Sequence, residues 1–132
     1  MQWSSSVNGG FSSGKPWLGV NPNHAYINAE AEEGSEDSVL SFYKKLIQLR
    51  KESNAIRRGG FEFLDEDSPV LFNYRRFDGN DEFLVLANFS DACVEYSKDI
   101  SGYYPVLKNY DREYKDSISE LKPYEVVVLK RS

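Results

Sequence analysis

Aromatic rings gather near the start of the chain, where Trp3, Phe11 and Trp17 share one stretch rich in Gly, Ser, Asn and Pro. Flat aromatic faces suit the C–H faces of sugar rings, and exposed aromatics are otherwise costly. One hypothesis is therefore a stacking platform for a sugar. The alternative is that the three rings anchor the loop to its own scaffold, as the usual burial of aromatic side chains favours.

Two other patterns in this stretch resemble functional sites, a phosphate-binding loop and a catalytic histidine, but the neighbouring residues do not support either. Gly9-x4-Gly14-Lys15 resembles a phosphate-binding loop, but the next residue must be Ser or Thr and must open a helix, and here it is Pro16. His24 is the only imidazole and has no Ser or Cys nucleophile near it in the sequence, which favours a surface residue. We predict neither nucleotide binding nor histidine catalysis.

Carboxylates are numerous but scattered. Glycosidic cleavage needs two carboxylates that face each other across a sugar, one of them with a raised pKa. The spacing indicates no such pair and favours solvated acids. The acids considered are Glu30, Glu32, Glu33, Glu36, Asp37, Asp65, Glu66 and Asp67. We predict no catalytic residue, no cofactor and no metal site in this chain.

Bulk composition limits the classes of function. The chain has 132 residues with 40% hydrophobic and 28% charged residues, which predicts one small packed domain. A net charge of -5 argues against binding to nucleic acid or to anionic membranes, and no apolar run reaches a membrane span. The single cysteine, Cys93, excludes an internal disulfide and favours the cytoplasm. Its strand-like surroundings predict a small core residue.

The first part of the chain predicts an irregular segment followed by one helix. Residues 1–35 lack an apolar period, and we expect them to be irregular and poorly ordered. Residues 36–54 read as an amphipathic helix with Ser35 as its N-cap. Its apolar arc covers about half the circumference, which suggests contact with two bodies. The arc consists of Val39, Leu40, Phe42, Tyr43, Leu46, Ile47 and Leu49.

Residues 55–132 read as a mainly β domain, a small antiparallel sandwich. The run 83–89 is apolar on both faces, which predicts a central strand, and Asp78-Gly79-Asn80-Asp81 before it is a hairpin signal. Gly59-Gly60 suggests a bulge or bend. The sequon at Asn88 falls in this buried strand, so we expect no glycosylation. Further strand candidates are 61–64, 70–77, 93–97, 105–110 and 124–130.

Several motifs together resemble the C-terminal portion of α-amylase-superfamily glucosidases, a group that includes oligo-1,6-glucosidases and α-glucosidases. The resemblance covers nearly the whole chain. Its motifs are Met1-Gln2-Trp3, Gly10-Phe11-Ser12-Ser13-Gly14-Lys15-Pro16-Trp17, Val20-Asn21-Pro22-Asn23, Ile27-Asn28, the stretch 43–51, Leu84-Val85-Leu86-x-Asn88-Phe89-Ser90 and Leu121-Lys122-Pro123-Tyr124-Glu125.

The resemblance implies a retaining α-glucosidase with a (β/α)8 barrel followed by a Greek-key β-sandwich. Residues 1–35 would be the remnant of the last βα loop, 36–54 the last barrel helix and 55–132 the sandwich. The catalytic carboxylates of the family would lie upstream, while Gln2, Trp3, Phe11 and Trp17 would rim the sugar site. Members of the family commonly carry Asp directly after the Gln-Trp pair, where this chain has Ser4-Ser5-Ser6.

Three hypotheses follow. In the first, the chain is a non-catalytic part of an α-glucosidase that acts on gluco-oligosaccharides, its main partner is the parent barrel, and the apolar helix face allows self-association. In the second, it is a sugar-binding module that uses tyrosines such as Tyr74, Tyr96, Tyr103 and Tyr104. In the third, it is a free-standing structural domain and the motif matches are chance.

Overall fold

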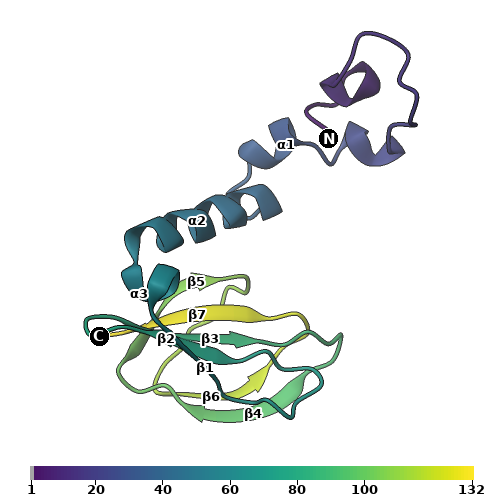
Figure 1. Cartoon of the computed structure of the whole chain (residues 1–132). Helices are drawn as coiled ribbons and strands as arrows, with labels where there is room; N and C mark the ends of the chain where they lie inside the picture. The colour runs from purple at the N-terminus through teal and green to yellow at the C-terminus, as the bar shows by residue number, and fades with distance from the viewer. Residues whose placement is uncertain (1) are drawn as a thin grey trace. The chain divides into compact units, whose positions relative to one another are not determined.

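The computed structural model describes residues 2–132 and divides into two compact units. The first unit ends at Ile47, and the second is Gln48–Ser132 (Figure 1). We describe each unit by itself. Among the described residues, no helix is both long enough and apolar enough to cross a membrane.

The first unit contains short helices where the sequence predicted irregular structure. They are the 3-10 turns η1 (Val7–Gly10) and η2 (Pro22–Ala25) and the helix α1 (Ala29–Glu33). Asparagines fix two of the starts: Asn21 accepts a hydrogen bond from the Asn23 amide, and Asn28 accepts one from the Ala31 amide at 2.9 Å. Isolated turns of this length escape a search for apolar periodicity, because they bury too little to show one. The expected poor order of residues 1–35 stays a prediction for amide exchange.

Helix α2 (Val39–Glu52) spans the boundary between the units and begins later than predicted. Ser38, and not Ser35, caps it, because the Ser38 hydroxyl accepts from the Ser41 amide at 3.1 Å and the Ser38 carbonyl from the Phe42 amide at 2.9 Å. The Ser35 carbonyl instead accepts from the Ser41 hydroxyl at 2.7 Å. The choice of Ser35 as N-cap was therefore wrong by one turn.

A third helix, α3 (Asn54–Arg58), follows where the sequence analysis placed the start of the β domain. The Ser53 side chain caps it by accepting from the Ile56 amide at 3.3 Å. Gly59 ends it and turns the chain into the first strand, as the Gly59-Gly60 pair predicted. A Cβ on Gly59 would meet backbone atoms of Phe77 and Ala55, so the bend requires glycine for space.

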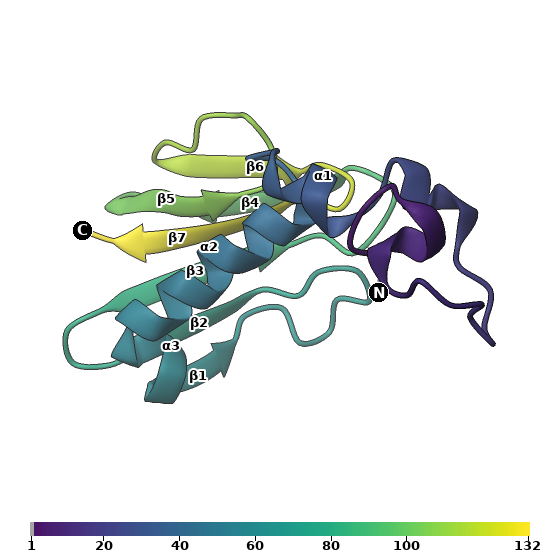
Figure 2. The same cartoon turned by 90° about the horizontal axis from the view of Figure 1, so that it is seen from above.

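The rest of the second unit is an antiparallel β-sandwich, as predicted. One sheet has the order β1-β2-β3-β7-β5, and the other pairs β4 with β6 (Figures 1 and 2). The bounds are β1 Gly60–Phe63, β2 Tyr74–Phe77, β3 Glu82–Ala87, β4 Val94–Asp99, β5 Tyr103–Lys108, β6 Ser117–Leu121 and β7 Val126–Arg131.

The core of the sandwich is built on the central strands. Leu84 and Leu86 of β3 pair with Leu129 and Val127 of β7 and therefore share their face. They join the core cluster that also contains Ile118 and Leu121 of β6. The prediction of a central β3 is confirmed, and so is the hairpin before it, where Asp78 accepts from the amides of Asn80 and Asp81 at 2.8 Å.

Two predictions about single elements were wrong. Strand β6 was missed, because its Ser-Ile-Ser-Glu-Leu sequence carries only two apolar residues, Ile118 and Leu121. Cys93 is exposed and lies just before β4, so it is not a core residue.

Candidate functional site

The candidate site lies in the loop of the first unit, which is anchored at Gln2. The Gln2 side-chain amide donates to Asn23 Oδ1 at 2.7 Å and to the Ile27 carbonyl at 2.8 Å. The backbone carbonyls of Gln2 and Trp3 accept from the amides of Ala29 and Glu30. These bonds tie the first residues to the start of α1, so Gln2 acts as a brace for the loop.

A left-handed turn shapes the next part of the loop. Asn8, Gly9 and Gly10 have φ values of 58°, 64° and 71°, a region that glycine and asparagine tolerate best. The Asn8 side chain donates to the carbonyls of Ser12 and Gly14 at 2.8 and 2.9 Å and holds the following bend. The sequence analysis did not select Asn8, although Asn-Gly-Gly is a recognisable signal for such a turn.

The loop encloses a cleft of about 450 Å³. Gln2, Phe11 and Trp17 all line it, so the structure brings three of the four candidate residues together. The other lining residues are Asn8, Pro16, Leu18, Gly19, Val20 and Asn21. Trp3 does not line this cleft, and half of its surface is exposed. Trp17 is 92% exposed and Phe11 68%, so both rings are free to meet a ligand or another surface.

The Ser4 side chain forms hydrogen bonds within its own loop. Its hydroxyl lies 2.7 Å from the Ser6 hydroxyl and accepts from the Ser6 amide at 3.3 Å. A short polar side chain that accepts from the amide two residues on stabilises a turn. The Ser4 side chain therefore shapes the loop before η1.

His24 also has a structural role. Its Nδ1 lies 3.0 Å from the Asn21 carbonyl, which requires the proton on that nitrogen, and its own carbonyl accepts from Asn28 Nδ2 at 2.9 Å. The hydrogen bond between the His24 ring and Asn21 thus stabilises the η2 turn.

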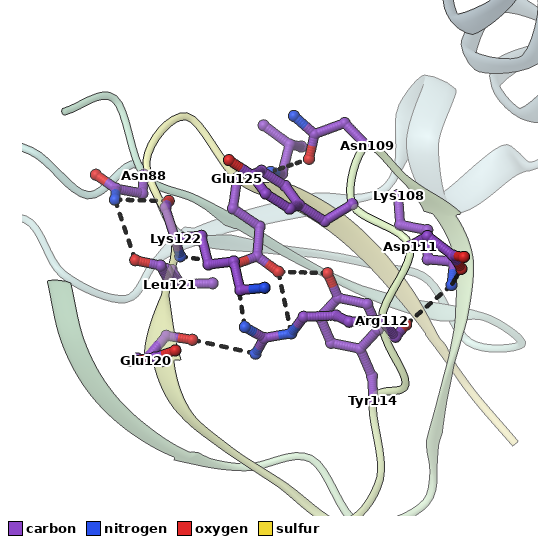
Figure 3. A network of polar contacts seen from close by, with 12 residues as sticks. Asn88, Lys108, Asn109, Asp111, Arg112, Tyr114, Glu120, Leu121, Lys122 and Glu125 are labelled. Atoms are coloured by element: carbon purple, nitrogen blue, oxygen red, sulfur yellow. Dashed lines mark hydrogen bonds and ion pairs between the residues drawn. The ribbon is translucent and has the colours of Figure 1, made fainter. Parts of the chain in front are cut away.

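In the second unit the carboxylate of Glu125 is buried and is bound by neighbouring groups of the sandwich (Figure 3). Arg112 approaches it twice, with Nε 3.2 Å from Oε1 and Nη1 3.3 Å from Oε2. The Tyr114 hydroxyl and the Lys122 amide also donate to it. Burial, and then the hydrogen bond to Glu125, raise the pKa of Tyr114 far above its usual value. Because every donor is a neighbour in the sandwich, this carboxylate reads as structural.

Glu82, the first residue of β3, anchors a second polar cluster. It accepts from the Tyr103 hydroxyl, from Arg75 at 3.3 Å and from Arg131 at 3.2 Å. The hydrogen bond from Tyr103 is the main cause that lowers the pKa of the Glu82 carboxyl. A carboxylate with a lowered pKa and three donors is a poor general acid at neutral pH.

The four tyrosines of the binding-module hypothesis do not form one platform. Tyr96 and Tyr103 pack against the core cluster, and the Tyr96 hydroxyl donates to Asp65 at 3.0 Å. Tyr74 lies on β2 and Tyr104 on β5, strands that β3 and β7 separate in the sheet.

Two further features bear on predictions made from the sequence: the sequon at Asn88 and the arrangement of possible metal ligands. The side chain of Asn88 is buried and donates to the carbonyls of Ala92 and Lys122 at 2.8 Å and to that of Leu121 at 3.2 Å (Figure 3), which leaves no room for a glycan. Within residues 2–132, no group of three or more His, Cys, Asp or Glu side chains is arranged to hold a metal ion.

Comparisons with known proteins agree on one family. The family model described as "Alpha amylase, catalytic domain" matches residues 1–59, up to the bend before β1. Probable oligo-1,6-glucosidase 2 of Bacillus subtilis (strain 168) is 41% identical over 129 residues, which cover 95% of this chain and 23% of that protein. Oligo-1,6-glucosidase of Parageobacillus thermoglucosidasius is 38% identical and covers 98% of this chain.

A solved structure also matches nearly the whole of this chain. Isomaltulose synthase from Klebsiella sp. LX3 superimposes with a TM-score of 0.88 at 36% identity, over 99% of this chain and 24% of that one. The chain thus spans about a quarter of the length of the relatives it matches.

Proposed function

For a chain that belongs to the α-amylase superfamily of glucosidases, we propose that it supplies a non-catalytic C-terminal part of a retaining enzyme that cleaves α-linked gluco-oligosaccharides. The supporting observation is how much of this chain and of each relative the match covers. Almost all of this chain matches about a quarter of each α-glucosidase relative, and the match to the catalytic-domain model ends at residue 59.

The loop of the first unit would contribute to the sugar site. Phe11 and Trp17 offer exposed rings beside a cleft, and Gln2 holds that cleft in shape through Asn23 and Ile27. Aromatic rings next to fixed amides suit a ligand that has both C–H faces and hydroxyl groups. In the parent enzyme these residues would rim the pocket, while the carboxylates that cleave the bond come from the parent barrel.

The sandwich would stabilise that barrel and carry no chemistry. The carboxylates of Glu125 and Glu82 are bound to neighbouring side chains of the fold. In the first unit, α2 exposes Val39, Tyr43 and Ile47 at four-residue spacing, an apolar stripe that suits packing against other helices. In the isolated chain this stripe would favour self-association. The lone exposed thiol of Cys93 supports a reducing location such as the cytoplasm.

A graft tests this function. The matching segment of the Bacillus subtilis relative is replaced by this chain, and the purified graft is assayed with p-nitrophenyl α-glucoside. We expect turnover by the graft and none by this chain alone or by the relative cut before the segment. A graft that folds, by its circular dichroism and unfolding transition, yet does not hydrolyse the substrate would overturn the proposal.

A carbohydrate-binding module remains the second candidate. Tyr104 supports it, because it lines an open cleft of about 490 Å³ beside the turn 78–81. Titration of the isolated chain with maltose and isomaltose oligomers separates the two readings. Saturable binding that Tyr104→Ala abolishes would favour the module.

A further inference from the structure

The turn 122–125, between β6 and β7, holds a tyrosine in a conformation that tyrosine rarely adopts. Pro123 has its φ fixed by its ring at about −65°, whereas Tyr124 has a φ of 53°. The Glu125 amide donates to the Lys122 carbonyl at 3.1 Å, so this is a type II turn. Its third position favours glycine, because a β-carbon crowds the backbone at positive φ. The other non-glycine residues with positive φ within residues 2–132 are an asparagine and an aspartate, which tolerate this region better.

Neighbouring groups hold this strained turn in place. The Tyr124 amide donates to the Ser90 carbonyl at 3.0 Å. The Asn109 side chain bridges the turn, because its Nδ2 donates to the Tyr124 carbonyl and its Oδ1 accepts from the Val126 amide, both at 2.8 Å. The Asn88 side chain donates to the first carbonyl of the turn at 2.8 Å (Figure 3). Strain of this kind persists only where the surrounding structure fixes the backbone.

Packing does not account for the tyrosine. The Tyr124 side chain is 60% exposed and is not part of the core cluster. Among residues 2–132, no aromatic pair and no cation–π contact includes its ring. A glycine at this position would relieve the strain and would bury no less of the core. A strained residue without a packing role is typical of a functional site.

The surroundings of the ring suit a sugar. The loop 89–91 is tied to Tyr124 through the Ser90 carbonyl, and it adds the exposed side chains of Phe89 and Asp91. Lys122 adds an ammonium group two positions before the ring. Apolar rings beside hydroxyl and charged groups match a ligand that has both C–H faces and hydroxyl groups. A surface that docks a protein has a wider apolar centre from which charged side chains are depleted.

We propose that Tyr124 is the stacking residue of a binding site for gluco-oligosaccharides on the sandwich. The class of sugar rests on the proposed function, and the position of the site rests on the turn. No bond is broken there, and the site would keep sugar chains close to the enzyme. The site does not include Tyr104, which pairs with Lys130 near the end of β7, whereas Tyr124 precedes the start of that strand.

The first test is a titration of the isolated chain, labelled with ¹⁵N, with maltotetraose and with isomaltotetraose. We expect saturable NMR shifts at the amides of Ser90 and Tyr124 with at least one of the two sugars. Tyr124→Gly and Tyr124→Asn suit a positive φ but lack the ring, so each should weaken binding at least about tenfold. Tyr124→Trp should keep it. Tyr26→Ala is the matched control, because Tyr26 is 72% exposed and lies in the first unit.

Thermal unfolding separates a ring that binds sugar from a ring that supports the fold. Tyr124→Gly should leave the unfolding midpoint of the isolated chain unchanged or raise it by up to about 4 °C, because glycine relieves the strained φ. A midpoint that falls would make the ring structural and overturn the inference.

The remaining outcomes separate this inference from its rivals. It is overturned if neither sugar moves the amides of Ser90 and Tyr124, or if Tyr124→Gly binds as tightly as the unchanged chain. Binding that only Tyr104→Ala removes would place the sugar beside the turn 78–81 and overturn it too. So would a dimer in ultracentrifugation that Tyr124→Gly dissociates, since the ring would then contact a second copy. A folded but inactive graft overturns the proposed function alone, because the titration needs no turnover.

Discussion

Arg112 holds Glu125 with two nitrogens, at 3.2 and 3.3 Å from the two carboxylate oxygens of a side chain that is completely buried. The Lys122 amide donates to the same carboxylate at 2.7 Å, so the network joins the end of β6 to the start of β7 (Figure 3). A buried charge that loses its partner is strongly destabilising, whereas an exposed pair contributes little.

The first prediction is that Arg112→Met lowers the free energy of unfolding of the second unit by about 3 kcal/mol, because it leaves Glu125 buried without its counter-charge. Urea unfolding followed by circular dichroism measures the change. Lys115→Met is the control, since its ion pair with Glu113 is largely exposed and should contribute at most about 1 kcal/mol. Equal losses in the two variants would contradict the account.

The second prediction concerns pH. The folded pKa of Glu82 lies below its unfolded value, mainly because Tyr103 donates to it. Its contribution is therefore fully present above the unfolded pKa of about 4.3 and is lost as the pH falls through the lower folded pKa. Glu82→Gln should destabilise the chain at pH 7, and the difference in unfolding free energy from wild type should shrink as the pH falls through that range.

Tyr103→Phe removes the main cause of this shift, so the Glu82 pKa measured by NMR should rise toward its usual value. Glu66→Gln, at an exposed acid, is the charge-matched control. A difference between wild type and Glu82→Gln that stays constant from pH 7 to pH 3 would contradict the assigned cause.

The third prediction follows from the bend after α3. A methyl group on Gly59 would press against backbone atoms of Phe77 and Ala55, which cannot move aside as a flexible side chain could. Gly59→Ala should therefore lower the free energy of unfolding by about 2 kcal/mol. Gly79→Ala should be close to neutral, because no atom lies within 4 Å of its added Cβ. The same urea unfolding assay compares the two, and a neutral Gly59→Ala would show that the bend is looser than described.

The fourth prediction concerns the sugar rim. In an active graft, Trp17→Ala should raise the KM for p-nitrophenyl α-glucoside roughly threefold to tenfold and leave kcat unchanged, because stacking would stabilise the bound substrate and the transition state alike. Trp3→Ala should have a smaller effect, since Trp3 does not line the cleft with Gln2, Phe11 and Trp17. Steady-state kinetics decides, and a KM that Trp17→Ala leaves unchanged would remove this ring from the site.

The sequence predicted the elements that bury a regular apolar pattern. Strand β3 was predicted because apolar residues on both of its faces require cover, and its hairpin because Asp78-Gly79 has one favoured geometry. Strand β6 escaped because only Ile118 and Leu121 face inward. The start of α2 was misplaced because Ser35 and Ser38 are both good caps, and a contact with the distant Glu32 side chain favours the later one.

The candidate site was only partly predictable for a related reason. Trp17 and Phe11 are visible as rings in a loop, but their meeting at one cleft depends on the brace from Gln2 to Asn23 and on the left-handed turn at Asn8. Contacts between residues more than twenty positions apart in an aperiodic loop leave no regular pattern in the sequence.

The measurement that tests the central claim most directly is the rate of p-nitrophenyl α-glucoside hydrolysis by the graft and by the isolated chain, at equal concentration in one assay. The account predicts turnover by the graft and, for the chain alone, no rate above that of buffer. Hydrolysis by the isolated chain, at a rate that increases with its concentration, would contradict the assignment of this chain as the non-catalytic part.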